Sequence, residues 1–339
     1  MSIKQLADYL GLSKSTVSRA LNGYKDVNFD TRLKVLEAAK ILGYKANPTA
    51  QRLASGRSKN IGIILPANAR MFVSSAFSKV LASASELLIK QGYQLIVTTI
   101  SPTQDEQKVY VDFITSGLVD GLFVVRTRHN DPRITLLKVH GFPYVCLGYE
   151  PGYQDDQFVD VDNQHAFYQL TKRQIKAGHQ RIAFLNAPLQ FTLATARQQG
   201  YLKAMQEAAL TVDKHYLLHG ELTERDAIEM TEQLMALATP PTCILCADDA
   251  MAFGAIVACE KQGYQPGVDI AIAGYGNYEH SQYTNPSITT LDYDTHGVGE
   301  QMSKLILNQL EVQNFTIQNW YEASIIIRES DVIKNNPTS

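Results

Sequence analysis

The sequence predicts a small all-α head, built around a helix-turn-helix, joined to a larger two-lobed α/β body with parallel sheets. Apolar residues in the first 45 positions recur only at helical spacing, whereas from Ile61 onward short apolar runs alternate with amphipathic stretches. A length of 339 residues suggests two or three domains. Charge divides at the same place: the first 60 residues carry 11 Lys and Arg against 4 Asp and Glu, and the remainder carries 20 against 30.

This charge division indicates different partners for the two parts. A head with a net charge of +7 attracts a polyanion, and a body with a net charge of −10 repels one. No run of about 20 apolar residues predicts a membrane span, and the first ten residues lack the apolar core of a secretory signal. We expect a cytoplasmic protein without a membrane partner, whose four cysteines are reduced.

The head is predicted to form helices near residues 3–10, 14–21 and 30–42. A short turn separates the first two, where Gly11 can take a left-handed cap and Ser13 can cap the next helix. Two helices joined in this way are typical of a helix-turn-helix. The candidate core residues of the third helix are Leu33, Leu36, Ala39 and Ile41.

A further short helix is predicted between the head and the body. Asn47 is a suitable N-cap, Pro48 suits the first helical position, and Gly56 suits the position after the helix. A helix of about eight residues is marginal alone in water, so this one needs a surface to pack on.

The body alternates predicted strands and helices, which is typical of parallel α/β units. About 280 residues are too many for one small sheet, so we expect two similar lobes with a crossover near 160–163. The expected strands are 61–65, 95–98, 121–125, 144–147, 181–185, 243–246 and 270–273, and the expected helices are 76–91, 105–117, 163–178, 196–209, 224–238, 249–262 and 295–310.

The polar face of the second helix carries short hydroxyl side chains and two cations, Lys14 and Arg19. These are groups that reach base edges and phosphates in a major groove. A solvated surface helix would look the same in isolation. The basic head, the preceding helix and the tight turn favour DNA.

The segment Ser13–Gly23, SKSTVSRALNG, resembles the recognition-helix motif V-S-x-x-T-V-S-R-x-L-N-G of the lactose/galactose repressor family, with Leu12 in place of the first valine. The resemblance continues through Leu42-Gly43-Tyr44 and Asn47-Pro48. In the body it includes Gly178-His179, Arg197-x-x-Gly200-Tyr201, Asp249-x-Met251-Ala252 and Pro286-x-x-Thr289-Thr290. It therefore covers nearly the whole chain.

The resemblance implies a dimeric transcription regulator, most simply a repressor, that binds a pseudo-palindromic operator in double-stranded DNA. Lys14 and Ser15 match the family's variable base readers. The short helix at 48–55 matches its hinge helix, in which Leu53 would wedge open a base step. The DNA-binding residues implied are Lys14, Ser15, Thr16, Ser18, Arg19, Asn22, Tyr44, Asn47, Ala50 and Leu53.

The body is implied to resemble a periplasmic sugar-binding protein, with a small carbohydrate effector between the lobes. The family's usual effector aspartate is replaced by Gly276, so Asn277 is the candidate substitute. No catalytic residue, metal or cofactor is expected. The effector-binding residues implied are Arg197, Asp248, Phe77, Phe72, Tyr275 and Asn277.

The corresponding domains are 1–46 for the helix-turn-helix, 47–60 for the hinge helix and linker, and 61–339 for effector binding and dimerisation. Within the body, we expect one lobe at about 61–160 and 292–319 and the other at about 161–291 and 320–339.

Two functions of other classes remain as alternatives at this point. One is a constitutive DNA-binding dimer whose body only dimerises. The other is a sugar-processing enzyme with Asp248 and Asp249 as catalytic carboxylates, although adjacent carboxylates on one loop seldom flank a glycosidic bond from opposite sides.

Metal-like spacings also occur at Cys243-x-x-Cys246 and within His215-Tyr-Leu-Leu-His219. The cysteines lie in an apolar run without a second pair, and no third ligand accompanies the histidines. We expect core cysteines and ordinary histidines.

Overall fold

The computed structural model describes residues 2–21, 24, 26–44, 56–67, 74–154 and 157–331. The expected helix at 48–55 lies outside these residues, as do the candidate site residues Asn22, Asn47, Ala50, Leu53 and Phe72. The chain divides into two compact units, Met1–Ser58 and Lys59–Ser339. Within the described residues, no helix is long and apolar enough to cross a membrane.

The first unit contains α1 (Ile3–Leu10), α2 (Lys14–Leu21) and α3 (Phe29–Ile41). Gly11 takes the expected left-handed conformation, with φ of 63°. The hydroxyl of Ser13 accepts a hydrogen bond from the backbone N–H of Thr16 at 3.1 Å, which satisfies a free donor at the start of α2. The helix-turn-helix prediction is therefore confirmed in its caps as well as its helices.

The predicted core of α3 is wrong at three of its four positions. Leu33, Leu36 and Ile41 are 43%, 45% and 77% exposed, and only Ala39 is buried. The buried residues are Val35, Ala38 and Ala39, and Leu42 packs against the same cluster. These positions share one face at helical spacing, and that face packs on Leu6 and Val17.

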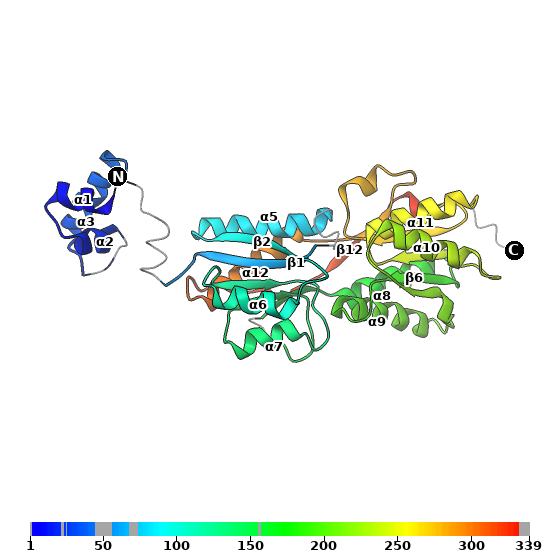
Figure 1. The fold of residues 1–339 in the computed structure, drawn as a ribbon. Coiled ribbons are helices and arrows are strands. Elements are labelled where there is room, and N and C mark those ends of the chain that lie inside the picture. The colour runs from blue at the N-terminus through cyan, green and yellow to red at the C-terminus, as the bar shows by residue number, and fades with distance from the viewer. Residues whose placement is uncertain are drawn as a thin grey trace. The chain divides into compact units, whose positions relative to one another are not determined.

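The second unit consists of two lobes, each with one six-stranded sheet (Figure 1). The first sheet has the order β11-β5-β4-β3-β1-β2, and all of its neighbouring strands run parallel. Helices α5 and α12 pack together, and so do α6 and α7. The bounds are β1 (Asn60–Pro66), α5 (Ser75–Lys90), β2 (Gln94–Ile100), α6 (Glu106–Thr115), β3 (Gly121–Val124), α7 (Pro132–Val139), β4 (Tyr144–Leu147), β5 (Phe158–Val161), α12 (Thr295–Gln309) and β11 (Trp320–Tyr321).

The second sheet has the order β12-β10-β9-β8-β6-β7, in which only β12 runs antiparallel to its neighbour. Helix α8 packs with α9, and α10 with α11. The bounds are α8 (Asn163–Lys176), β6 (Ile182–Asn186), α9 (Thr192–Glu207), β7 (Leu217–His219), α10 (Glu224–Met235), β8 (Cys243–Cys246), α11 (Asp249–Lys261), β9 (Ala271–Tyr275), β10 (Thr289–Tyr293) and β12 (Ala323–Ile326), with the 3-10 turns η2 (Lys214–Tyr216), η3 (Glu279–Gln282) and η4 (Glu329–Asp331).

The chain passes from one lobe to the other three times. The second and third crossovers lie a few residues from the lobe boundaries that the sequence predicted. Residues 292 and 293 belong to β10 of the second sheet, and residues 320 and 321 form β11 of the first. Strand β11 has two residues, too few for alternation to reveal it. Strands β5, β7, β10, β11 and β12 and helix α7 have no counterpart among the expected elements.

Candidate DNA-binding and effector sites

The outer surface of α2 presents the predicted DNA-binding side chains. Lys14, Ser15 and Arg19 are exposed, while Thr16 and Ser18 are partly buried. The hydroxyl of Ser13 contacts the hydroxyls of Ser15 at 2.7 Å and Thr16 at 2.8 Å. Val17 and Ala20 on the opposite face are buried in the core of the head. The helix is therefore anchored on one side and offers donors and acceptors on the other.

Arg19 forms an ion pair with Asp26, and its guanidinium lies 5.3 Å from the centre of the Tyr24 ring. Both charged side chains are about half exposed, so solvent screens the pair strongly. A phosphate could therefore replace Asp26 at small cost. Tyr44, the last described DNA-binding candidate of the head, is partly buried against the helical core.

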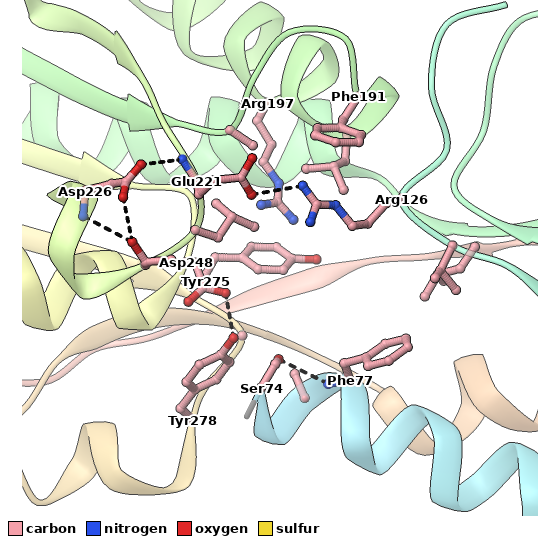
Figure 2. A pocket seen from close by; sticks show the side chains of 18 of the residues that line it. Ser74, Phe77, Arg126, Phe191, Arg197, Glu221, Asp226, Asp248, Tyr275 and Tyr278 are labelled. Atoms are coloured by element: carbon pink, nitrogen blue, oxygen red, sulfur yellow. Dashed lines mark hydrogen bonds and ion pairs between the residues drawn. The ribbon is translucent and has the colours of Figure 1, made fainter. Parts of the chain in front are cut away.

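A cavity of about 380 Å³ lies between the two lobes of the body (Figure 2). Its walls come from the carboxyl ends of parallel strands in both sheets, together with the first turn of α5. Ligands in open α/β sheets bind at such strand ends. The lining residues are Ser74, Ala76, Phe77, Val125, Arg126, Leu147, Ala187, Phe191, Leu193, Arg197, Glu221, Leu222, Thr223, Arg225, Asp226, Asp248, Tyr275, Gly276, Tyr278 and Tyr293.

Arg197 projects from α9 into this cavity and is held on several sides. Its Nε donates to Asn163 Oδ1 at 2.8 Å, and one Nη donates to the carbonyl of Ala247 at 2.6 Å. The guanidinium lies 4.0 Å from the centre of the Tyr275 ring. Figure 2 shows the guanidinium above this ring, so its position is fixed before any ligand arrives.

Asp248 is held through both of its carboxylate oxygens. One carboxylate oxygen accepts from the backbone N–H of Ala250 at 2.8 Å and caps α11, and the other accepts from the hydroxyl of Tyr278 at 2.6 Å. The residue also lines the cavity. Burial raises the pKa of Asp248 to about 7, and its hydrogen bond to Tyr278 opposes that rise.

Asp249 is not available to a ligand. It is fully buried and accepts from the backbone N–H of Tyr278, the hydroxyl of Ser281 and the hydroxyl of Thr290, at 2.8, 2.7 and 2.6 Å. Burial raises the pKa of Asp249, and these hydrogen bonds favour its charged form. This carboxylate ties three segments of the second lobe together, so Asp248 and Asp249 do not face the cavity as a pair of carboxylates.

Of the other effector candidates, Phe77 and Tyr275 line the cavity and Asn277 does not. Asn277 Oδ1 accepts from Arg328 at 2.7 Å instead. The turn places residue 277 in the left-handed conformation, with φ of 45°, and this directs the amide towards Arg328. Asn277 therefore does not take the place of the missing aspartate at the cavity wall, although the sequence suggested it.

The sequence did not indicate several lining residues, which lie at or beyond the ends of both predicted strands (β3, β6 and β9) and unpredicted ones (β7 and β10). Arg126 and Glu221 form an ion pair at 3.1 Å, and the Phe191 ring lies 4.4 Å from the Arg126 guanidinium. Tyr278 and Tyr293 complete the aromatic wall. An arginine directly after a strand is the one signal that could have indicated Arg126.

The metal-like spacings have ordinary explanations. Cys243 and Cys246 are fully buried in β8, as expected for core residues. His215 contacts Asp213 and His219 contacts Gln198, each at 2.8 Å, and they lie on a 3-10 turn and a strand rather than on one helix.

These features define a class of protein: a helix-turn-helix unit joined to a two-lobed body with an interlobe binding cavity. Comparison with family models agrees. Residues 2–47 match bacterial regulatory proteins of the lacI family, and residues 58–327 match the periplasmic binding proteins and sugar binding domain of the LacI family. The chain belongs to the LacI family of transcriptional regulators, which are not enzymes.

Two curated relatives extend over nearly the full chain. The HTH-type transcriptional regulator AglR of Rhizobium meliloti (strain 1021) is 34% identical over 336 residues, covering 97% of this chain and 94% of its own. The HTH-type transcriptional repressor PurR of Haemophilus influenzae (strain ATCC 51907 / DSM 11121 / KW20 / Rd) is 29% identical over 337 residues, covering 97% and 98%.

Solved structures show the same fold. A cellobiose complex of the regulator CelR has a TM-score of 0.74 at 25% identity and covers 97% of this chain and 99% of its own. A lac repressor dimer bound to operator has a TM-score of 0.81 at 24% identity and covers 98% and 99%.

Proposed function

We propose that this regulator is a cytoplasmic repressor of a carbohydrate-utilisation operon, which binds a pseudo-palindromic operator as a homodimer and responds to a neutral sugar in the interlobe cavity. The observation that carries the proposal is the cavity itself. It combines aromatic walls with a fixed guanidinium and a carboxylate, as a polyhydroxylated ring requires. The curated relatives AglR and PurR support the regulatory role, and the CelR–cellobiose complex supports the ligand class.

The charges around the cavity favour an uncharged ligand. Arg126 is paired with Glu221 at 3.1 Å, and Arg225 with Glu229 at 3.2 Å. Among the described lining residues, Arg197 is the arginine without an ion pair, and Asp226 and Asp248 are carboxyl groups without one. One cation therefore faces two acids, so a sugar phosphate or sugar acid would bring an excess negative charge.

The proposed mechanism has two states that differ in how the lobes meet. Beside the cavity, the hydroxyls of Thr127 and Thr192 share a buried hydrogen bond at 2.8 Å, and the backbone N–H of Thr192 donates to the carbonyl of Thr127 at 3.0 Å. A sugar that binds one lobe arrangement better shifts the population towards it. The change in lobe angle alters the spacing of the two heads and the pairing of the hinge helices at 48–55.

Arg197→Ala tests the effector site. In fluorescence anisotropy with operator DNA, the variant should bind the operator as the wild type does and should no longer respond to the sugar that shifts the wild type. Lys203→Ala is the matched control and should keep the sugar response, because this cation lies on the same helix as Arg197, is exposed and does not line the cavity.

The sugars for this titration are glucose, galactose, maltose, cellobiose, trehalose and sucrose, with glucose 6-phosphate and gluconate as charged comparisons. An unchanged sugar response in Arg197→Ala would contradict the assignment of the cavity. Silence of the wild type towards every compound would favour a constitutive DNA-binding dimer. The direction of the wild-type response distinguishes an inducer from a corepressor.

A further inference from the structure

Tyr278 is fixed at both ends beside the effector cavity. Its backbone N–H donates to Asp249 Oδ2 at 2.8 Å, and its hydroxyl donates to Asp248 Oδ2 at 2.6 Å. The residue is almost fully buried, and its ring packs with Ala76 of the first lobe and Ala250 of the second. A tyrosine held in this way presents its hydroxyl and ring edge in one defined position.

The Tyr278 ring packs against Gly276 and leaves no room for a side chain at that position. Gly276 has φ of +111°, a conformation that side chains rarely adopt. A Cβ added there would lie 2.9 Å from Cε1 of Tyr278, which is closer than real Cβ contacts. The Tyr278 ring therefore occupies the space into which a side chain at 276 would project. The Tyr278 hydroxyl is one polar group at this part of the wall, and Ser74 is another.

The Asp248–Tyr278 pair retains capacity for a ligand. Each carboxylate oxygen of Asp248 has one recorded partner, and a carboxylate oxygen can accept two hydrogen bonds. Burial, together with the nearby Asp248 charge, raises the pKa of Tyr278 well above its usual range, so the phenol keeps its proton. The pair thus offers free acceptor positions on Asp248 beside an aromatic ring; Figure 2 shows the bond that joins the Tyr278 hydroxyl to Asp248.

We propose that Tyr278 is a specificity-determining residue of the effector site, which orients Asp248 to accept from one particular hydroxyl of the bound sugar. This proposal rests on the proposed sugar effector. A sugar hydroxyl that donates to the Asp248–Tyr278 pair replaces water at a buried carboxylate, and a stereoisomer with that hydroxyl elsewhere leaves the carboxylate unsatisfied. Sites of this kind reject analogues that lack the group they are built to bond.

The test is a double-mutant cycle between Tyr278 and the ligand. Isothermal titration calorimetry on the full chain first identifies the best-binding sugar among those named above, and then measures each monodeoxy derivative of that sugar. In the wild type, one deoxy position should lower affinity by about 10- to 100-fold, as for a hydrogen bond to a charged group. In Tyr278→Phe, affinity for the parent sugar should fall, and the same deoxy position should lose most of its effect.

Tyr283→Phe is the matched control, because Tyr283 is 77% exposed and does not line the cavity. Its deoxy profile should equal that of the wild type. Operator binding and the melting temperature check the fold of each variant. If Tyr278→Phe is unstable, Asp248→Asn tests the pair from its other side, since the amide oxygen can keep the bond from Ala250 and the same deoxy position should lose its effect.

Two results would overturn the proposal, and they are distinguishable. Identical deoxy profiles in the wild type and a folded Tyr278→Phe would remove Tyr278 from specificity while leaving the sugar effector intact. Failure of the wild type to bind any compound of the panel would remove the sugar effector, and the role of Tyr278 with it.

Discussion

Asp248 is a buried carboxyl group that also lines the interlobe cavity. The folded state raises its pKa to about 7, whereas an unfolded aspartate titrates near 4. Below about pH 4 both states hold the proton. Between about pH 4 and pH 7 the unfolded state loses its proton first, so stability falls as pH rises through this window, and above it the full cost remains.

Asp248→Asn should therefore gain stability relative to the wild type as pH rises. The amide can accept from Ala250 and donate to the Tyr278 oxygen, and it does not titrate. The difference in free energy of unfolding should move in favour of the variant by on the order of a few kcal/mol between pH 5 and pH 8. Calorimetric melting at both values measures it. The buried Asp160 has a raised pKa for which Asp248 is not a cause, so its contribution cancels in the difference. A pH-independent difference would contradict the assignment.

At the scale of elements, α2 is anchored in the head by its buried face. On its outer face, Arg19 forms an ion pair with Asp26. If Arg19 contacts a phosphate on the operator, it releases a counterion. Arg19→Ala should then weaken binding to specific and unrelated DNA alike and reduce the slope of log affinity against log salt by about 1. Anisotropy at several salt concentrations measures this. A change confined to one operator base pair would instead make Arg19 a base reader.

For the expected hinge helix, we predict a loss of affinity that depends on the DNA sequence. Leu53→Ala should weaken operator binding by on the order of 10-fold or more and affect unrelated DNA much less, because the wedge acts only on a bent site. Leu36→Ala is the matched control: this leucine is half exposed on α3, and its truncation should change neither affinity. Equal losses on both DNAs for Leu53→Ala would contradict the hinge assignment.

For the whole molecule, the boundary between the units lies close to the boundary between the charges. The head unit ends at Ser58, whereas Lys59 and Asn60 belong to the body. The backbone N–H of Lys59 donates to Asp120 at 2.9 Å, and the amide of Asn60 donates to the carbonyl of Leu118 at 2.9 Å. The acidic body begins where these bonds begin.

Deletion of residues 1–58 should abolish operator binding and leave sugar affinity within about 2-fold, because the bonds of Lys59 and Asn60 are kept and the cavity lies wholly in the body. Calorimetry with the best-binding sugar and anisotropy with operator DNA measure the two activities. A matched deletion of residues 1–60, which removes both residues from the edge of β1, should melt at a lower temperature. Residual operator binding by either variant would place part of the DNA site in the body.

Local patterns in the sequence were sufficient for the helix-turn-helix, its caps at Gly11 and Ser13, and most strands and helices of the body. These features depend on neighbours a few residues away, which spacing and capping rules describe. The same rules predicted the wrong buried face of α3. Leu33 and Leu36 are apolar enough for the core, so they were expected there, but the core forms from Val35, Ala38 and Ala39. Hydrophobicity alone does not say which face meets a neighbour.

The sequence by itself determined the class of protein, through the motif of residues 13–23, the charge division and the alternation of strands and helices. Only the tertiary structure decided which side chains line the cavity and how they are held. It joined Arg126 to Glu221 across the lobes, turned Asn277 towards Arg328, buried Asp249, and set the Tyr278 hydroxyl on Asp248. These contacts join residues from different strand ends, and their geometry depends on how two sheets are packed, which no local pattern records.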